Sequence, residues 1–214
     1  MKLYIMRHGE TDWNIQGKIQ GSTDVPLNEN GIFLAEQTRD GLKKAGIVFD
    51  TIFSSPFIRA RRTAEIIADG NCVPELDGRI AEMAFGKYEG VSIREVSENP
   101  AYGNIRNFFR NPREYVAEEG SESYEEAIAR IGDFYEDRIR PLAGNDKNCL
   151  IVCHGAIIRA FLVYLCHMEL DQLWKLKQPN CSINVFDVTP ERAVLSEQSK
   201  IFYDDTLVPK RKYT

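Results

Sequence analysis

The sequence predicts an α/β protein with a three-layer α/β/α architecture, in which a mostly parallel sheet lies between helices. Short apolar runs alternate along the chain with segments of helical periodicity, a pattern typical of parallel sheets that are covered on both faces. Two of these runs, at 3–7 and 150–153, are followed by the same pair of residues, His-Gly. A long segment, 86–120, breaks the alternation and predicts an insertion of helix and loop.

Local signals place the individual elements. Asn28 is a suitable N-cap for a helix with regularly spaced apolar residues, and Gly46 suits its end. Pro56 stands where proline is tolerated, in the first turn of the next helix. The polar sequence from Ser121 offers capping groups for a long helix. The expected strands are 2–6, 51–54, 73–76, 149–153, 182–188 and 193–198, and the expected helices are 28–46, 56–69, 92–98, 121–139 and 156–166.

Residues 1–214 are expected to form a single domain, with residues 86–120 as a lid over the carboxyl ends of the strands. The lid is rich in Gly, Pro, Asn, Arg and aromatic residues, and a loop of this length inside a compact domain is usually functional. Its aromatic side chains suit either packing or substrate contact, and both readings stay open. A basic run at 210–212 is expected to be solvated.

The composition excludes several classes of protein. Of the 214 residues, 43% are hydrophobic and 28% are charged, as in ordinary globular proteins, and the net charge of −5 argues against a general nucleic-acid binder. No apolar run approaches the ~20 residues of a membrane span, and no signal-peptide pattern precedes the first strand. The five scattered cysteines are expected to be reduced. We therefore expect a cytoplasmic monomer or homodimer without nucleic-acid or membrane partners.

Two of the three histidines, His8 and His154, follow predicted strands and directly precede glycines. Neighbouring strands lie ~4.8 Å apart, and ligands of open α/β sheets bind outside the carboxyl ends of the strands. We therefore expect the two imidazoles to share one pocket. His167, at the end of a predicted helix, is expected to be structural.

The residues around the first histidine favour binding of an anion. Gly9 permits a sharp turn whose backbone N–H groups can surround an anion. Arg7 adds a planar guanidinium suited to phosphate oxygens, and Arg59 adds a second from the first turn of a helix, where anions are favoured. Asn14 and the turn Gln20-Gly21-Ser22 offer neutral donors.

A neutral imidazole in such a site is a competent nucleophile for phosphoryl transfer and would form a phosphohistidine. Two successive in-line displacements need no metal ion where Arg and His side chains stabilise the developing charge. The leaving oxygen then needs a general acid. Glu82, in an apolar context next to the lid, is the first candidate. Glu10 is the second candidate. It lies in the turn from His8 to Thr11, called the anion loop here, where an ionised carboxylate would repel the substrate, so we expect its side chain to point away.

The chain resembles the histidine phosphatase superfamily, in its phosphoglycerate mutase-like branch, over nearly its full length. Five blocks in the same order carry the resemblance: Arg7-His8-Gly9-Glu10-Thr11 with Asn14; Asp24 to Gly31; Ser54-Ser55-Pro56 with Arg59-Ala60 and Thr63-Ala64; Glu82 with Phe85-Gly86 and Glu89-Gly90; and His154-Gly155. The resemblance implies a mixed six-stranded sheet between helices.

The resemblance also implies roles for individual residues. His8 would be the residue that is phosphorylated, Arg7, Arg59 and His154 would hold the phosphoryl group, and Glu82 would be the acid and base. The full set expected to bind phosphate or substrate comprises Arg7, His8, Asn14, Gln20, Gly21, Arg59, His154 and Gly155.

Two departures from the mutase pattern favour a phosphatase. Mutases usually carry a His-Tyr-Gly-type stretch directly after the glutamate and an asparagine soon after the second His-Gly. This chain has Met83-Ala84-Phe85-Gly86 and Ala156-Ile157-Ile158 at these places. The lid arginines Arg106, Arg110 and Arg113 keep the mutase open, because they could bind a carboxylate.

Two further alternatives stay open at this stage. Arg62 lies one turn from Arg59 and competes for the phosphate-binding role, although a solvated or ion-paired position fits it better. Trp13 suits lining of the pocket and packing equally well.

We therefore expect a metal-independent phosphomonoesterase that hydrolyses small phosphorylated metabolites through a phosphohistidine intermediate, without a cofactor. The alternative is a 2,3-bisphosphoglycerate-dependent phosphoglycerate mutase. A non-catalytic phosphate-binding module would require loss of Arg7, His8, Arg59 or His154, and all four are present. Substrate specificity is expected to come from residues 86–120.

Overall fold

The sheet contains six strands in the order β3-β2-β4-β1-β5-β6. Strands β3, β2, β4 and β1 run parallel, whereas β5 and β6 run antiparallel to their neighbours. The computed structural model describes residues 1–207. The strands are β1 Lys2–Arg7, β2 Thr51–Ser54, β3 Glu75–Leu76, β4 Asn148–Cys153, β5 Ile183–Val188 and β6 Ala193–Lys200. The predicted α/β class with a mostly parallel six-stranded sheet is confirmed.

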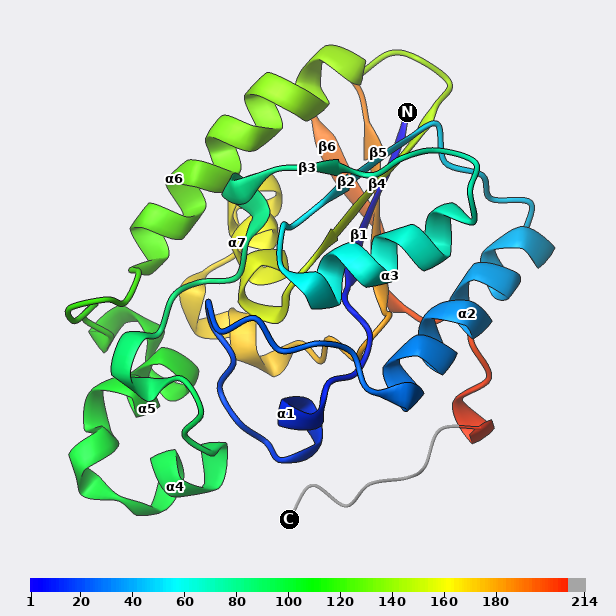
Figure 1. The fold of residues 1–214 in the computed structure, drawn as a ribbon. Helices are drawn as coiled ribbons and strands as arrows, with labels where there is room; N and C mark the ends of the chain where they lie inside the picture. The colour runs from blue at the N-terminus through cyan, green and yellow to red at the C-terminus, as the bar shows by residue number, and fades with distance from the viewer. Residues whose placement is uncertain (208–214) are drawn as a thin grey trace.

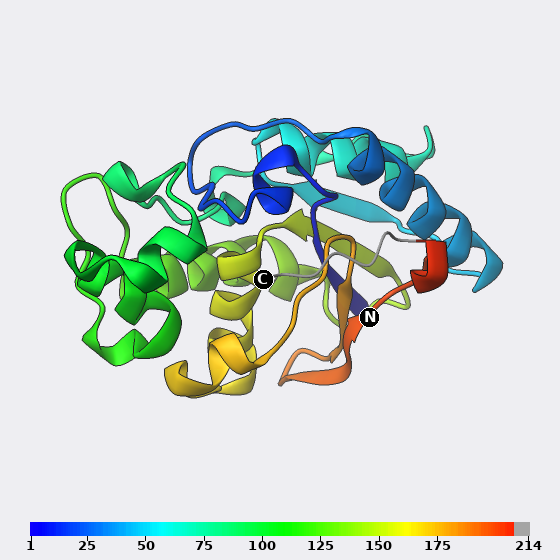
Figure 2. The ribbon, with the colours of Figure 1, turned by 90° about the horizontal axis from the view of Figure 1, so that it is seen from below.

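Helices cover both faces of this sheet (Figure 1). Helices α2 (Glu29–Lys44) and α3 (Ile58–Ala68) lie on one face, and α6 (Tyr124–Phe134) and α7 (Gly155–Cys166) lie on the other. The view from below shows the same three layers (Figure 2). As expected, Asn28 caps α2, since its side chain accepts a hydrogen bond from the N–H of Gly31.

The alternation of side chains along each strand feeds two hydrophobic cores. In β1, Leu3 and Ile5 pack on the α6–α7 face, whereas Tyr4 and Met6 pack on the α2–α3 face. Because a shift of one residue would turn each side chain to the wrong face, this packing fixes where β1 ends. It therefore also fixes the position of His8, just beyond the strand.

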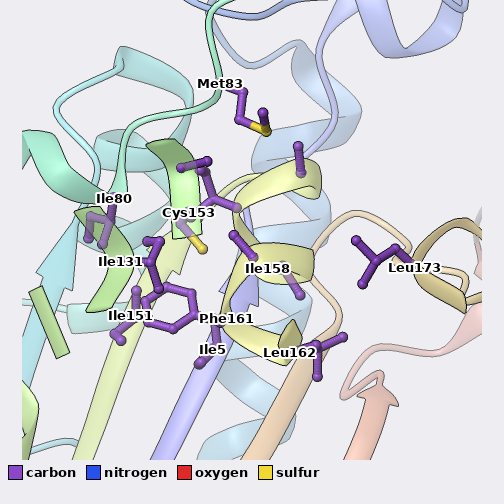
Figure 3. Close-up of a cluster of buried hydrophobic side chains, with 14 of the residues drawn as sticks. Ile5, Ile80, Met83, Ile131, Ile151, Cys153, Ile158, Phe161, Leu162 and Leu173 are labelled. Carbon is purple, nitrogen blue, oxygen red and sulfur yellow. The ribbon is translucent and has the colours of Figure 1, made fainter. Parts of the chain in front are cut away.

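Figure 3 shows part of the core on the α6–α7 face. Ile131 of α6 and Phe161 of α7 are buried there with Ile151 of β4. The same core extends into the lid and includes Met83, which directly follows the candidate acid Glu82. The lid and the sheet are thus held by one continuous apolar cluster.

The lid contains more regular structure than predicted. The short helix expected at 92–98 is present as α4 (Ile93–Glu98), and a second helix, α5 (Gly103–Arg110), follows it. Both lie to one side of the sheet, toward the carboxyl ends of the parallel strands (Figures 1 and 2). Helix α5 buries Ile105 and Phe108, and several aromatic rings surround Phe108. Only these two of the eight residues of α5 are buried, so the sequence shows no clear helical periodicity there and α5 was not predicted.

Other elements differ at their ends. The segment before Asn28 was expected to be a loop, but it contains a short helix, α1 (Asp12–Ile15), held by a capping box at Thr11. Strand β3 spans only two of the four residues expected, because its exposed residues pair with β2 alone. The long helix begins at Tyr124 rather than 121, since Ser123 and Glu126 form its capping box, and it continues as a π-helix over 135–139.

Within residues 1–207, no helix is both long and apolar enough to cross a membrane. All five cysteines lie in this range and none forms a disulfide. The basic run at 210–212 lies outside the described residues.

Candidate active site

The two histidines meet at the carboxyl edge of the sheet, as predicted. Strands β1 and β4 are parallel neighbours in which Arg7 pairs with Cys153, so the next residue of each strand is a histidine. The N–H of His8 donates to the carbonyl of Cys153 at 3.0 Å. The ring centroids of His8 and His154 are 5.2 Å apart, and both side chains are buried.

The surroundings of His8 select one tautomer of its ring. Its Nδ1 lies 2.6 Å from the carbonyl oxygen of Gly9, and a carbonyl only accepts hydrogen bonds. Nδ1 must therefore carry the proton, and Nε2 keeps its lone pair. Gly9 itself is required by close packing, because a Cβ there would lie 2.6 Å from the carbonyl oxygen of Gly31 at the start of α2.

His154 is held in the opposite tautomer. The Nε of Arg59 donates to Nδ1 of His154 at 3.2 Å, and a guanidinium cannot accept a hydrogen bond. The proton of neutral His154 therefore sits on Nε2, which donates to the hydroxyl oxygen of Ser55 at 2.7 Å. Burial, together with the positive charges of Arg59 and Arg7, lowers the pKa of both imidazoles well below 6.5. Both rings are therefore neutral at physiological pH.

These two neutral imidazoles predict an acid-sensitive fold. In the unfolded chain a histidine titrates near pH 6.5, so below that pH the unfolded state binds more protons than the folded state. The free energy of unfolding should then fall on acidification below about pH 6.5, by roughly 1.4 kcal/mol per pH unit for each histidine. Urea unfolding between about pH 7 and pH 5.5 measures this slope.

The control for this slope is a pair of histidine variants. His154→Gln should lose one histidine's share of the slope, and His167→Asn, at the exposed end of α7, controls for replacing a histidine outside the site. Equal slopes in wild type and His154→Gln would contradict the assignment of His154 as a buried neutral base.

Arg59 is fully buried in the first turn of α3. Besides its bond to His154, its Nη1 donates to the carbonyl of Thr23 at 2.9 Å and its Nη2 to the carbonyl of Gly21 at 2.8 Å. Burial lowers the pKa of Arg59 to about 10, so the group still carries its charge at neutral pH. Gly21, which was expected to donate to phosphate, lines the cavity, and its carbonyl orients the guanidinium of Arg59.

Arg62, the alternative to Arg59, is exposed and pairs with Glu65 at 3.2 Å. Arg59→Lys should lower both kcat and kcat/KM by about 10²–10³, because one ammonium cannot hold His154, Thr23 and a phosphoryl oxygen together. Arg62→Lys should behave like wild type, since a surface pair contributes little. Steady-state kinetics on one phosphomonoester compares the two, and a crippled Arg62→Lys beside an intact Arg59→Lys would reverse the assignment.

Glu82 lies beside the amino end of α7. Its carboxylate accepts hydrogen bonds from the N–H groups of Met83, Ala156 and Ile157 at 3.1–3.3 Å. A Cβ on Gly155 would lie 3.8 Å from Nε of Arg7 and 3.9 Å from Oε2 of Glu82. The candidate acid and the first arginine therefore both face Gly155, as does Nη1 of Arg159, which would lie 3.7 Å from that Cβ.

Glu10, the alternative acid, also lines the cavity described below. Its Oε1 accepts hydrogen bonds from the side-chain amides of Asn28 and Asn30 at 3.0 and 3.1 Å. These bonds tie Glu10 to the start of α2. Glu82, in contrast, is held next to Arg7 over Gly155.

A cavity of about 570 Å³ opens at this edge of the sheet. Of the predicted set it is lined by Arg7, His8, Asn14, Gln20, Gly21, Arg59, Glu82 and Gly155. His154 is not part of the lining but lies against Arg59 and His8. Asn14 and Gln20 both accept a hydrogen bond from the hydroxyl of Thr11, so they also hold the anion loop together.

Sequence reasoning missed several cavity residues. Asn180 donates to the carbonyls of His8 and Gly9 at 3.0 and 3.1 Å. Arg159 is buried, stacks 4.1 Å above the ring of Trp174 and donates to the carbonyl of Gly155. A signal existed for Arg159, which lies one helical turn beyond Gly155. Asn180 lies three residues before the start of β5, and the amino end of an antiparallel strand reaches the same sheet edge.

The lid arginines do not reach the cavity. Arg106 donates to the carbonyls of Val96 and Asn99, and Arg113 pairs with Glu169 and Asp171. Together with Arg110, they are absent from the cavity lining within the described residues. Trp13 likewise packs near Lys18 and Gly90 instead of lining the cavity. The lid instead contributes Ile93 and Phe109 to the lining.

Comparison with known proteins gives the class that this fold and site define. A family model of the histidine phosphatase superfamily (branch 1) matches residues 3–200. The chain belongs to this superfamily.

Individual relatives fall into two activity classes. The putative phosphoserine phosphatase 2 of Hydrogenobacter thermophilus is 32% identical and is matched over 94% of this chain and 96% of that protein. The 2,3-bisphosphoglycerate-dependent phosphoglycerate mutase 2 of Lactiplantibacillus plantarum is 26% identical over 92% and 97%. Among solved structures, a mutant phosphoserine phosphatase from Entamoeba histolytica in complex with phosphoserine aligns with a TM-score of 0.79, 31% identity and coverage of 93% and 96%.

Proposed function

We propose that this protein is a metal-independent phosphomonoesterase that hydrolyses small phosphorylated metabolites through a phosphohistidine on His8. The observation that carries the proposal is the tautomer of His8. Its Nδ1 proton is held by the Gly9 carbonyl, so Nε2 keeps a lone pair, and the residue lines a cavity that Arg7 and Arg59 also line. An orthophosphate ester bound there meets both a nucleophile and two cations.

The reaction would proceed in two displacements. In the first, Nε2 of His8 forms a bond to phosphorus while the ester P–O bond breaks and Glu82 gives its proton to the leaving oxygen. In the second, water attacks the phosphohistidine, Glu82 takes the water proton, and the electron pair of the P–N bond returns to Nε2. Arg7 and Arg59 would stabilise the equatorial oxygens in both steps, while His154, whose ring nitrogens bond Arg59 and Ser55, would orient Arg59.

The alternative is the mutase, in which the phosphohistidine returns its phosphoryl group to a phosphoglycerate. Two observations favour the phosphatase. Ala156-Ile157-Ile158 follow Gly155, where mutases carry an asparagine soon after the second His-Gly, and the lid arginines lie outside the cavity lining. The deciding assay offers 3-phosphoglycerate with 2,3-bisphosphoglycerate and follows isomerisation beside phosphate release from a panel of monoesters. Phosphate release without isomerisation is expected, and rapid isomerisation with little release would establish the mutase.

The panel should include phosphoserine and 3-phosphoglycerate, because related structures hold these two ligands. We propose that the 86–120 lid of a single-domain enzyme sets specificity, since Ile93 and Phe109 form part of the cavity wall. Five unpaired cysteines fit a reducing compartment such as the cytoplasm.

Catalysis should not depend on a metal ion. Within the described residues, no group of three or more His, Cys, Asp or Glu is placed to hold one, and the arginines supply the positive charge at the site. Dialysis against a chelator should leave kcat unchanged. Loss of activity that magnesium or zinc restores would contradict this expectation.

A further inference from the structure

The carboxylate of Glu89 has an unusually complete set of donors. Glu89 lies at the base of the lid and accepts hydrogen bonds from the N–H and hydroxyl of Ser22, both at 2.8 Å, and from the N–H of Phe85 at 3.1 Å. It also accepts from the N–H of Thr23 at 2.9 Å and from the hydroxyl of that residue. Five donors from two separate segments therefore converge on one side chain.

The loop held by Glu89 is the loop that orients Arg59. The carbonyls of Gly21 and Thr23 accept the two hydrogen bonds from Nη2 and Nη1 of Arg59. In the same stretch, the N–H groups of Ser22 and Thr23 point to Glu89. The loop thus faces the carboxylate with its donors and the guanidinium with its acceptors.

Gly21 confirms how closely the carboxylate is packed against the loop. A Cβ at this position would lie 2.2 Å from Oε1 of Glu89, and the backbone adopts φ of +58°. Only glycine satisfies both conditions. Three backbone bonds continue the same junction, in which residues 17–19 pair with residues 90–93 of the lid.

We propose that Glu89 is a positioning residue for the phosphate site, which acts through the Gly21 and Thr23 carbonyls on Arg59 and so couples the lid to the phosphoryl pocket. Its charge suits this role. Burial raises the pKa of Glu89, but the hydrogen bonds from Thr23, Phe85 and Ser22 outweigh burial, and the pKa lies below its ordinary value. The proposal rests on the proposed function only for its kinetic test.

The first test replaces the carboxylate by an amide of the same shape. In Glu89→Gln, the amide NH₂ would face donors, so part of the loop loses its acceptor. We expect kcat/KM to fall about 10- to 100-fold, the effect of losing one or two charge-assisted hydrogen bonds. The matched control is Glu118→Gln, because Glu118 is a lid carboxylate bonded to Lys87, Tyr88 and Asn104 and lies outside the cavity lining. It should remain within about twofold of wild type.

The second test separates positioning from general destabilisation. If Glu89 acts through Arg59, the two substitutions should not add: Glu89→Gln should cost much less in the Arg59→Lys background than in wild type. Equal costs in both backgrounds would overturn the proposal. Thermal unfolding shows which variants stay folded at the assay temperature, and Thr23→Val, which removes only the hydroxyl donor, provides a milder change of the same kind.

A binding measurement keeps this proposal distinct from the proposed function. Titration with orthophosphate by calorimetry reports the phosphate site without any turnover. Glu89→Gln should weaken phosphate binding, whereas Glu118→Gln should not. Unchanged phosphate affinity in a folded Glu89→Gln would overturn the positioning role, even if the wild-type chain were active. A wild-type chain that binds phosphate but hydrolyses no ester would overturn only the proposed function.

Discussion

His8→Ala is expected to lower kcat by about 10⁴ or more on every phosphomonoester that the wild type hydrolyses. The reason is that no other side chain at the site is free to replace His8 as the nucleophile. Both ring nitrogens of His154 are engaged, one by Arg59 and the other by Ser55. Glu10 is held at the start of α2 by Asn28 and Asn30. A site without a nucleophile retains binding and charge stabilisation but loses the covalent route.

The measurement has two parts. Phosphate release gives kcat, and mass spectrometry of wild type quenched in alkali, where phosphohistidine survives, should locate the phosphoryl group on the peptide that contains His8. His167→Asn is the matched control, because His167 is an exposed histidine whose positive φ suits asparagine. Substantial turnover by folded His8→Ala, or a phosphoryl group on another residue, would rule out His8 as the nucleophile.

The positions of both histidines could be predicted because side-chain packing on both faces of the sheet fixes the register of the two strands that precede them. Apolar residues on both faces of β1 and β4 fix the register, and the parallel pairing of Arg7 with Cys153 then sets the next two residues side by side. Burial of a continuous apolar run is visible in sequence. The sheet position of His8 and His154 follows from it directly.

The placement of the other site residues depends on contacts between distant segments, which the sequence alone does not reveal. Asn180 reaches the anion loop because β5 is antiparallel, and strand direction cannot be derived from an apolar run alone. The partners of Arg59 and Glu89 come from a loop far away in sequence. The lid arginines were placed by residue type alone, and ion pairs with the distant residues Glu169 and Asp171 hold Arg113 outside the cavity lining.

The charges of the site explain why a phosphate dianion suits it. Arg7, Arg59 and Arg159 line the cavity, while the two imidazoles beside them are neutral. Burial lowers the pKa of both Arg59 and Arg159 to about 10, the direction expected for cations removed from water. An anion at this place restores the balance of charge, and it gains most as negative charge spreads over the equatorial oxygens in the transition state.

Glu82→Gln is expected to separate substrates by their leaving groups. An alkyl alcohol is a poor leaving group and needs a proton as its bond to phosphorus breaks, whereas nitrophenolate leaves without one. General acid catalysis contributes about 10²–10⁴ in rate, so alkyl phosphates should lose that factor. Nitrophenyl phosphate should lose less than about tenfold. The measurement is kcat/KM for both substrates in wild type and variant.

The nitrophenyl ester also serves as the internal control for geometry. Gln at this position keeps only one oxygen, while the N–H groups of Met83, Ala156 and Ile157 all point to the carboxylate. If the substitution mainly disturbs the amino end of α7, both esters suffer alike, because the phosphoryl group is common to them. Equal losses for the two esters would therefore show that Glu82 is a positioning residue, and Glu10 would become the candidate general acid. In that case Glu10→Gln should show the leaving-group contrast, even though its bonds to Asn28 and Asn30 hold it at the start of α2.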